Sequence, residues 1–316
     1  MRILRHTSGV PSEVLGSTIA LGNFDGVHHG HRAVLEETIR QAQSLSTASG
    51  VLTFEPHPRS FFAPDAPPFQ LTSLRDKARV IESLGIDFLI AQHFEATFAD
   101  WSAETFVQRT LVEDLKVAHV VTGYDFRFGE GRKGNSSTLK KLAKRFGFAY
   151  TTMGPVTKGG EVYSSTKIRA LLQNGAPEEA ALLLGRYWEI EGRVETGSGL
   201  GRELGFPTAN FALGDHLQPK PGIYAVRAGV DEGKNTVWQE SVAYLGTRPT
   251  FGGTTMLFEV YFFDGTPDLY GKRLRVQLIG YLREDETFED AEALKRQMKK
   301  DAVQAREILA KTGDPA

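Results

Sequence analysis

Two histidines lie three residues apart in a stretch that is rich in glycine. His28 and His31 carry imidazole groups that hydrogen-bond phosphate oxygens as negative charge develops on them. Gly22, Gly26 and Gly30 allow a tight turn and a close approach of the backbone to a ligand. These residue types at this spacing indicate phosphate binding and the transfer of a phosphate-bearing group.

Two other interpretations of this stretch stay open. A turn from a strand into a helix carries glycine and polar residues for turn chemistry alone. Clustered histidines also ligate metals. However, His28 and His31 lie across a turn, the chain has no cysteine, and no second ligand cluster is obvious in the sequence. Phosphate binding is the interpretation that we favour.

A second stretch with chemical potential lies near residue 200. Four glycines in nine residues, 197–205, offer backbone N–H groups that can cradle phosphates. Thr208 and Asn210 are oxygen ligands two residues apart, so both face one side of an extended segment. That geometry suits Mg²⁺. The alternative is a turn that is stabilised by hydroxyl and amide hydrogen bonds.

Aromatic and hydroxyl side chains form two further candidate sites. Residues 55–68 contain too much proline for a regular helix or strand. Phe54, which precedes this segment, and Phe61 and Phe62 within it suit stacking on a flat ring, or alternatively packing into a core. Hydroxyls in residues 162–169 either cap a helix or donate to a triphosphate.

The elements that must position these residues alternate in the first half of the chain. Apolar runs predict strands, and helical spacing predicts helices between them. This alternation predicts a parallel, doubly wound α/β sheet, whose ligand lies at the carboxyl ends of the strands by the switch point. The strands are expected at 17–21, 50–54, 87–92, 119–123 and 148–153, and the helices at 33–45, 73–84, 102–115 and 137–146.

The pattern changes after Gly185 to short strands with turns. We therefore place a boundary near Arg186, giving domains 1–185 and 186–316. Several strands joined by glycine and proline turns predict a small antiparallel β-barrel, which a C-terminal amphipathic helix, 288–309, follows. The strands are expected at 186–195, 224–230, 237–245, 257–263 and 273–279.

The bulk properties limit the partners of the chain. A length of 316 residues fits one large or two ordinary domains. A net charge of −2 gives no long-range attraction to nucleic acid or to an anionic membrane, so neither is expected as a partner. No apolar run approaches the roughly 20 residues of a membrane helix, and the first residues lack the apolar core of a signal peptide. The absence of cysteine fits a reducing compartment, and we expect a cytoplasmic location. The sequence leaves open whether the chain forms a homo-oligomer.

A family resemblance follows from the first stretch. The pattern His28-x-Gly30-His31 after Gly-Asn-Phe-Asp-Gly resembles the signature of the nucleotidylyltransferase superfamily, and the longer string 22–32 resembles bacterial bifunctional riboflavin kinase/FAD synthetases. Residues 163–169 resemble the second signature of that family, with Arg169 as the charge stabiliser. The resemblance implies that ATP is bound by Gly22, Phe24, Asp25, Gly26, His28, His31, Ser164, Ser165, Thr166 and Arg169.

The string 123–134 is typical of FAD synthetases as well. Together with the proline-rich loop, the resemblance implies a flavin site formed by Phe54, Pro56, Pro58, Phe62, Asp125 and Phe128. Tyr163 departs from the family, which usually has Ile or Val before the serines, and we expect this to affect packing more than chemistry.

The second half resembles riboflavin kinases. The string 205–210 is similar to their signature, and 221–224, 246–251, 269–272 and 282–284 are further matches. The resemblance implies that ATP is bound by Gly199, Gly201, Gly205, Thr208 and Asn210, with Mg²⁺ on Thr208 and Asn210. It also implies that Glu259 is the general base. Tyr244 and Gly265 depart from the family pattern, which bears on substrate affinity more than on the type of reaction.

The resemblance thus implies a bifunctional enzyme that converts riboflavin to FMN in its second half and FMN to FAD in its first. ATP and Mg²⁺ are required, and the flavins are substrates and products, so no tightly bound organic cofactor is expected. His28, His31 and Arg169 would stabilise the charge on the triphosphate. Two alternatives stay open. A nucleotidylyltransferase for another substrate leaves the second half unexplained. A flavin-binding regulator without turnover does not explain the complete set of catalytic residue types.

Overall fold

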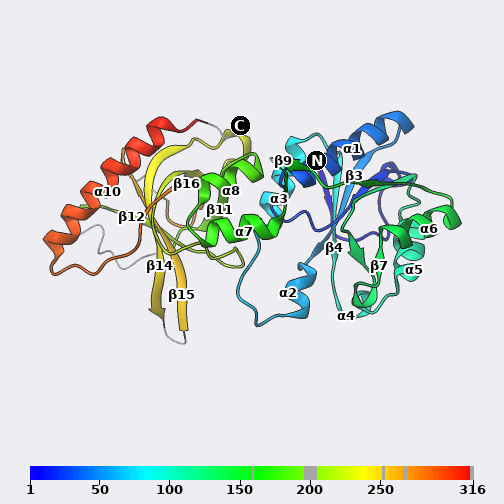
Figure 1. The fold of residues 1–316 in the computed structure, drawn as a ribbon, viewed down its shortest axis with the longest axis horizontal. Coiled ribbons are helices and arrows are strands. Elements are labelled where there is room, and N and C mark those ends of the chain that lie inside the picture. The colour runs from blue at the N-terminus through cyan, green and yellow to red at the C-terminus, as the bar shows by residue number, and fades with distance from the viewer. Residues whose placement is uncertain (159, 196–204, 251–252, 266–268, 314–316) are drawn as a thin grey trace. The chain divides into compact units, whose positions relative to one another are not determined.

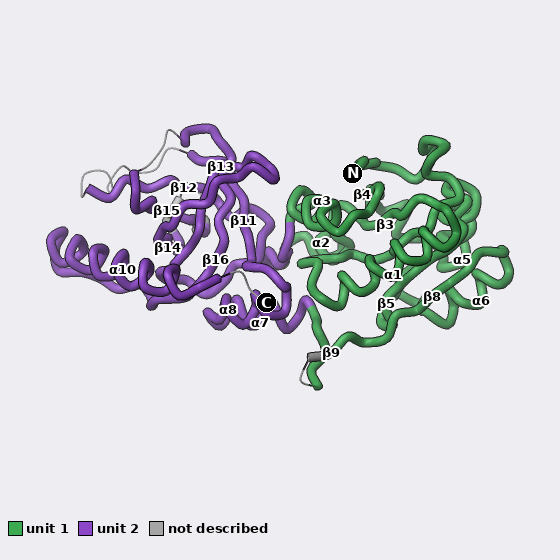
Figure 2. Tube along the Cα trace, turned by 90° about the horizontal axis from the view of Figure 1, so that it is seen from above, with its two compact units in different colours: residues 1–66, 73–164 green, residues 67–72, 165–316 purple. Residues whose placement is uncertain are grey.

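The computed structural model describes residues 1–316 except 159, 196–204, 251–252, 266–268 and 314–316. The chain folds as two compact units, which are coloured separately in Figure 2. Unit 1 contains residues 1–66 and 73–164, and unit 2 contains residues 67–72 and 165–316. Each unit is described by itself below.

Unit 1 is built on a six-stranded parallel sheet, as the alternation predicts (Figure 1). The inner strands are mostly apolar and buried because helices cover both faces of such a sheet, whereas the two edge strands are partly exposed. From β2 the chain continues to β3 and β4 on one side and later to β5 and β8 on the other. The carboxyl ends of β2 and β5 therefore flank the switch point, where ligands bind in open α/β sheets. In sheet order the strands are β1 Arg2–Leu4, β4 Phe88–His93, β3 Ser49–Glu55, β2 Thr18–Leu21, β5 His119–Gly123 and β8 Ala149–Met153.

Four helices of unit 1 begin after residues whose side chains cap them in the same way. His28, Ser73, Ser102 and Asn135 each accept a hydrogen bond from a backbone N–H group three residues later. The helices are α1 His29–Leu45, α2 Pro58–Phe62, α3 Leu74–Ser83, α4 Ala96–Ala99, α5 Ala103–Phe106, the π-helix η2 Val107–Asp114 and α6 Ser136–Phe146. Short elements complete the unit: η1 Ser12–Val14, β6 Arg127–Phe128, η3 Glu130–Arg132, β7 Gly134–Asn135, β9 Thr157–Lys158 and β10 Glu161–Val162.

Three expectations for unit 1 were wrong in detail. The proline-rich segment contains a short helix, α2, because Pro58 occupies the first helical position, where a missing N–H group costs nothing. The helix expected at 33–45 begins at His29, because His28 caps it. The helix expected at 102–115 changes to a π-helix from Val107 onward.

Unit 2 is a six-stranded antiparallel sheet that closes on itself, which confirms the predicted barrel. The edge strands β11 and β12 meet where Glu195 donates its backbone N–H to the carbonyl of Asn210 at 2.8 Å. In sheet order the strands are β11 Trp188–Arg193, β16 Arg273–Arg283, β13 Gly222–Val230, β14 Gln239–Thr250, β15 Gly253–Phe262 and β12 Thr208–Ala212. The helical elements are α7 Ser165–Gln173, α8 Pro177–Leu184, η4 Gly233–Asn235 and α10 Ala291–Lys311.

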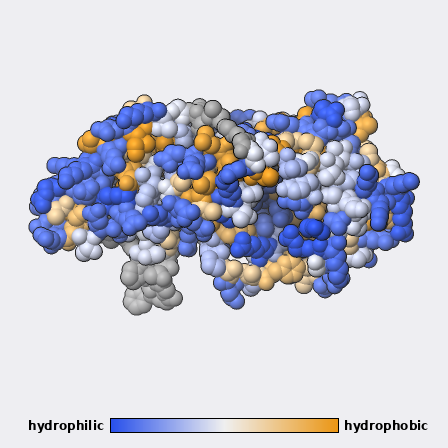
Figure 3. Space-filling model, viewed as in Figure 1, coloured by the Kyte–Doolittle hydropathy of each residue, from blue (hydrophilic) through white to orange (hydrophobic). Residues whose placement is uncertain are grey.

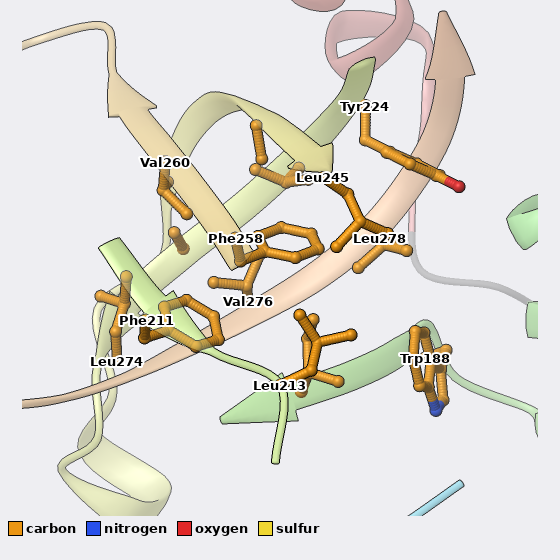
Figure 4. Close-up of a cluster of buried hydrophobic side chains, with 14 of the residues drawn as sticks. Trp188, Phe211, Leu213, Tyr224, Leu245, Phe258, Val260, Leu274, Val276 and Leu278 are labelled. Carbon is orange, nitrogen blue, oxygen red and sulfur yellow. The ribbon is translucent and has the colours of Figure 1, made fainter. Parts of the chain in front are cut away.

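Large aromatic side chains fill the inside of the barrel (Figure 4). Trp188, Phe211, Tyr224 and Phe258 are each less than 2% exposed. The indole Nε1 of Trp188 donates to the carbonyl of Leu71 at 2.8 Å, which joins residues 67–72 to this unit. Because burial of such side chains is the main stabilising term in a small domain, this core fixes the strand register.

Helices α7 and α8 also belong to unit 2. Ile168, Leu172, Ala180 and Leu184 from these helices are buried in the same core as Trp188. The division by packing therefore falls at Ser164, whereas the sequence places the domain boundary near Arg186. The boundary between the two catalytic domains stays a prediction.

The surface drawn in Figure 3 carries more hydrophilic than hydrophobic side chains. Among the described helices, none has the length and apolar character that crossing a membrane requires.

Candidate functional sites

The turn between β2 and α1 brings His28 and His31 together. The two rings stack with their centroids 3.7 Å apart and an angle of 17° between their planes. His28 is buried, and its Nδ1 accepts the backbone N–H of His31 at 3.3 Å. A ring that accepts at Nδ1 carries its proton on Nε2 when it is neutral. His28 therefore has Nε2 as a donor beside the first turn of a helix.

The glycine of the His-x-Gly-His pattern, Gly30, lies close to the ring of His28. A Cβ atom at residue 30 would lie 3.1 Å from two ring atoms of His28 and 3.7 Å from the Cβ of Tyr163. A larger residue at this position would therefore press on the imidazole of His28, which glycine leaves undisturbed. Tyr163 contacts the ring of His29, with centroids 5.1 Å apart, so the departure at this position is used in packing.

The backbone of the turn is strained. Phe24 has φ +50°, Val27 has φ +42° and Gly26 has φ +86°. A β-branched residue with positive φ is a conformational outlier that costs on the order of 1–3 kcal/mol. Phe24 and Val27 are both buried, and Phe24 contacts the ring of His31 edge-on at 5.4 Å. The packing of these two side chains holds the backbone in this strained conformation. Such strain is typical of turns that bind a ligand, whereas a turn that only reverses the chain does not need it.

Three of the flavin candidates belong to one array of aromatic rings in unit 1. Phe54 is buried against Phe98 and Phe106, and Phe128 is buried against Phe106 as well. Phe62, from α2, contacts the array through Phe94 and is 67% exposed. The array thus combines buried rings with the exposed ring of Phe62, whose face can stack on a flat ligand.

The remaining flavin candidates lie on segments that leave the sheet at its carboxyl edge. Pro56 follows β3 directly, and Pro58 begins α2. Asp125 is exposed after β5. The flavin-binding role of these residues stays a prediction.

The second group of ATP candidates is divided between the units. Ser164 ends unit 1, whereas Ser165, Thr166 and Arg169 belong to unit 2. The Nε of Arg169 donates to the carbonyl of Phe69 at 2.8 Å, and its guanidinium lies 5.3 Å from the centre of the Phe69 ring. Both residues belong to unit 2, and the role of Arg169 at the triphosphate stays a prediction.

In unit 2, β12 presents Thr208 and Asn210 on the same face, as the extended spacing predicts. Ala209 and Phe211 alternate with them and are buried in the core. The Nδ2 of Asn210 donates to the carbonyl and to Oγ1 of Thr208, at 3.2 Å and 3.3 Å. The Oδ1 of Asn210 is buried and has no hydrogen-bond partner within the described part of the chain. A buried carbonyl oxygen of this kind fits a cation ligand.

Glu259 stands opposite Asn210 in the register of β12 and β15, and Tyr244 of β14 stands opposite Glu259. Directly opposed residues share a face of the sheet, so these three polar side chains form one row. The hydroxyl of Tyr244 donates to Oδ2 of Asp285 at 2.8 Å. That ring needs a glycine at residue 246, because a Cβ there would lie 1.9 Å from the hydroxyl oxygen. The departure at Tyr244 therefore lies beside the predicted base.

The predicted phosphate cradle is described only in part. Gly199 and Gly201 lie outside the described residues, and so do residues 266–268. Gly205 has φ +84°, a left-handed conformation that favours glycine.

The sequence analysis missed one charged residue near the His28 turn. Lys77 of α3 is buried, and its Nζ lies 3.4 Å from Oγ1 of Thr53. The signal was present in the helical pattern. Lys77 is three residues after Leu74 and four before Ile81, so it falls on the apolar face of α3. Because the apolar face of a helix packs against the core, a lysine on that face is expected to be buried.

Comparisons with known proteins assign each half of the chain to a described family. Residues 11–167 match the family model described as FAD synthetase, and residues 184–309 match the model described as riboflavin kinase. Among curated proteins, the bifunctional riboflavin kinase/FMN adenylyltransferase of Escherichia coli strain K12 is 37% identical over 312 residues, covering 99% of this chain and 98% of the relative. The protein of the same description from Haemophilus influenzae is 37% identical over 306 residues, covering 97% and 98%.

One solved structure is similar over almost the whole chain. A crystal structure described as a macrolide-efflux protein from Streptococcus pneumoniae superposes with a TM-score of 0.83 at 28% identity, and the match covers 96% of this chain and 98% of that one.

Proposed function

The chain belongs to the bifunctional riboflavin kinase/FMN adenylyltransferase family, and from this premise we propose how its residues divide two successive reactions. Riboflavin is phosphorylated to FMN with ATP at the row of polar side chains in unit 2. FMN is then adenylylated to FAD with a second ATP at the turn between β2 and α1. The single observation that supports this division best is the pairing of a stacked His28–His31 turn with an Asn210–Glu259 row in one polypeptide.

In the kinase reaction Glu259 acts as the general base. It takes the proton from the ribityl hydroxyl while that oxygen attacks the γ-phosphorus of ATP, and ADP leaves. Asn210 and Thr208 supply the oxygen atoms that would hold Mg²⁺, and the unsatisfied Oδ1 of Asn210 supports this role. Bound Mg²⁺ offsets the negative charge of the phosphates.

In the adenylyl transfer the protein supplies no nucleophile. A phosphate oxygen of FMN attacks the α-phosphorus of ATP, a new P–O bond forms, and pyrophosphate leaves. His28 donates through Nε2 toward the phosphate oxygens, and the backbone N–H groups at the start of α1 add positive potential. His31 stabilises the charge that develops on the pyrophosphate.

The aromatic array of unit 1 provides the surface for the isoalloxazine ring. Phe62 is the exposed ring, and Phe54 and Phe128 support the segments around it. Both reactions consume ATP, and we infer that the enzyme works in the cytoplasm.

The test is incubation of the purified chain with riboflavin, ATP and Mg²⁺, followed by separation of the flavins and measurement of ADP and pyrophosphate. The proposal predicts FMN and then FAD, with one ADP and one pyrophosphate released for each FAD. Formation of neither FMN nor FAD would refute it.

A further inference from the structure

Lys77 is a charged residue that the mechanism above does not use. Its side chain extends from α3 toward the sheet of unit 1 and is 3% exposed, and it is the only buried lysine among the described residues. Burial lowers the pKa of Lys77, because the ammonium group loses its hydration, and the carboxylates of Asp25 and Glu55 oppose this shift. A buried ammonium group is costly unless anions compensate it, so the position is unusual for a lysine whose only role is packing.

A chain of polar contacts joins Lys77 to the phosphate-binding turn. The hydroxyl of Thr53, at the end of β3, donates to the carbonyl of Asn23 at 3.1 Å. Because that hydroxyl donates its hydrogen to Asn23, its oxygen accepts from Nζ of Lys77, which lies 3.4 Å away. The contacts therefore run from α3 through β3 to the residue that precedes Phe24.

The charge of Lys77 acts on the same turn. Asp25 belongs to the turn, and Glu55 ends β3. The turn contains Phe24 and Val27 in the left-handed region, a conformation that persists only where the surroundings enforce it. Lys77 acts on this turn through the backbone carbonyl of Asn23 and through the carboxylate of Asp25.

We propose that Lys77 is a positioning residue for adenylyl transfer, which holds the turn between β2 and α1 in its ATP-binding conformation through Thr53 and Asp25. The inference rests on the proposed role of that turn in binding the triphosphate. Lys77 touches neither ATP nor flavin in this account. Its effect reaches the reaction through the backbone N–H groups and the His28 ring that the turn presents.

The first test is Lys77→Met in the full chain, which keeps the length of the side chain and removes its charge. We expect kcat/KM for ATP in FAD formation from FMN to fall about 10- to 100-fold, because a misplaced turn weakens phosphate binding and alignment. FMN formation from riboflavin in the same protein should stay within about twofold of wild type, since it uses residues of unit 2. The matched control is Arg79→Met, which removes a cation from the same helix, where Arg79 pairs with Asp76 at 2.9 Å. That control should leave FAD formation within about twofold of wild type.

A second variant covers the case in which Lys77→Met does not fold. Thr53→Val keeps the shape of the side chain and removes the hydroxyl that links Lys77 to Asn23. It should lower kcat/KM for ATP in FAD formation and leave FMN formation unchanged. FAD formation at the wild-type level in folded Thr53→Val and in any folded Lys77→Met would overturn the inference. Absence of FAD formation in the wild-type chain would instead contradict the proposed function itself.

A pH profile separates positioning by charge from a purely structural role. The charged form of Lys77 holds the turn, and its pKa is lowered, so support for the turn is lost as pH rises through that pKa. In wild type the ratio of FAD to FMN formation should therefore fall as pH rises through the lowered pKa of Lys77. Lys77→Met should lack this fall, and the same fall in both proteins would contradict positioning by charge.

Discussion

At the scale of single residues, the two proposed sites use polar groups that the fold has already oriented. Asn210 and Glu259 are opposed across two strands, and the stacked rings of His28 and His31 are fixed by a helix cap. Side chains that are oriented before the substrate binds need little reorganisation during the reaction, which is the usual source of electrostatic catalysis. Each proposed site can therefore be inactivated by a single substitution that leaves the fold intact.

Glu259→Gln tests the base of the kinase reaction. The amide cannot accept the proton of the ribityl hydroxyl, so FMN formation should fall by about 10²- to 10⁴-fold. FAD formation from added FMN should stay at the wild-type level. Glu232→Gln, which changes an exposed carboxylate in the same unit, serves as the control. Unchanged FMN formation in Glu259→Gln would exclude Glu259 as the base.

His119 gives unit 1 a dependence of stability on pH. Its ring is buried in β5, and its Nε2 lies 2.9 Å from Oγ1 of Thr151. Burial lowers the pKa of His119 from its ordinary value of 6.5, while Glu37 opposes and Arg40 adds to the shift. The folded state thus favours the neutral ring. Its contribution to stability is present above pH 6.5 and is lost as pH falls through the lowered pKa.

The measurement for His119 is denaturant unfolding between pH 7.5 and pH 5, roughly the range over which a histidine titrates. His119→Gln, which keeps a polar group beside Thr151, should show a weaker loss of unfolding free energy on acidification than wild type. His93→Gln changes an exposed histidine of the same sheet and should behave like wild type. An identical pH dependence in wild type and His119→Gln would contradict this account.

At the scale of elements, the C-terminal helix is held to the barrel by an ion pair whose carboxylate is buried. Arg283 of β16 donates through Nε and a terminal nitrogen to both carboxylate oxygens of Asp301 in α10, at 2.9 Å and 2.7 Å. This pairing raises the pKa of Arg283, so the guanidinium is charged at any working pH. The pair therefore fixes where α10 lies along β16.

Removal of one partner of this pair should destabilise the barrel. Arg283→Met leaves the buried carboxylate of Asp301 with the Nε2 of Gln297, at 2.9 Å, as its side-chain donor among the described residues. We expect a loss of about 3 kcal/mol of unfolding free energy, measured by urea denaturation. Arg40→Met, which breaks the pair of the exposed Arg40 with Glu37, should cost much less, because solvent screens the Arg40 charge. Equal effects of the two substitutions would show that burial of the Arg283 pair adds nothing.

Much of the parallel sheet of unit 1 could be predicted from the sequence. Apolar runs predicted β2, β3, β4 and β5, because a strand buried on both faces is apolar throughout. The strand β1 was not predicted, since it is only three residues long and partly exposed. Alternation predicted that Thr208 and Asn210 share a face, since side chains of a strand alternate. The helix α2 and the π-helix η2 were not predictable from spacing, because local capping and packing decide them. The contact between Lys77 and Thr53 depends on tertiary packing, and only the position of the lysine on an apolar helix face indicated it.

At the scale of the whole molecule, the chain folds as two compact units, and two family models match its first and second halves. The units do not coincide with a simple division of the chain, because residues 67–72 join unit 2. Leu71 accepts from Trp188, and Gln70 donates to the carbonyl of Asp215. A segment of six residues is too short to show a sequence pattern, so its packing in unit 2 could not be predicted.

The central claim is that separate sets of residues in one polypeptide carry the two reactions. Its most direct measurement is the flavin produced from riboflavin, ATP and Mg²⁺ by His28→Ala alone, by Glu259→Gln alone and by an equal mixture of the two variants. The account predicts FMN without FAD from the first, little FMN or FAD from the second, and FAD from the mixture, because FMN released by one variant is adenylylated by the other. A mixture that makes FMN but no FAD, or a single substitution that abolishes both FMN formation from riboflavin and FAD formation from added FMN, would contradict the account.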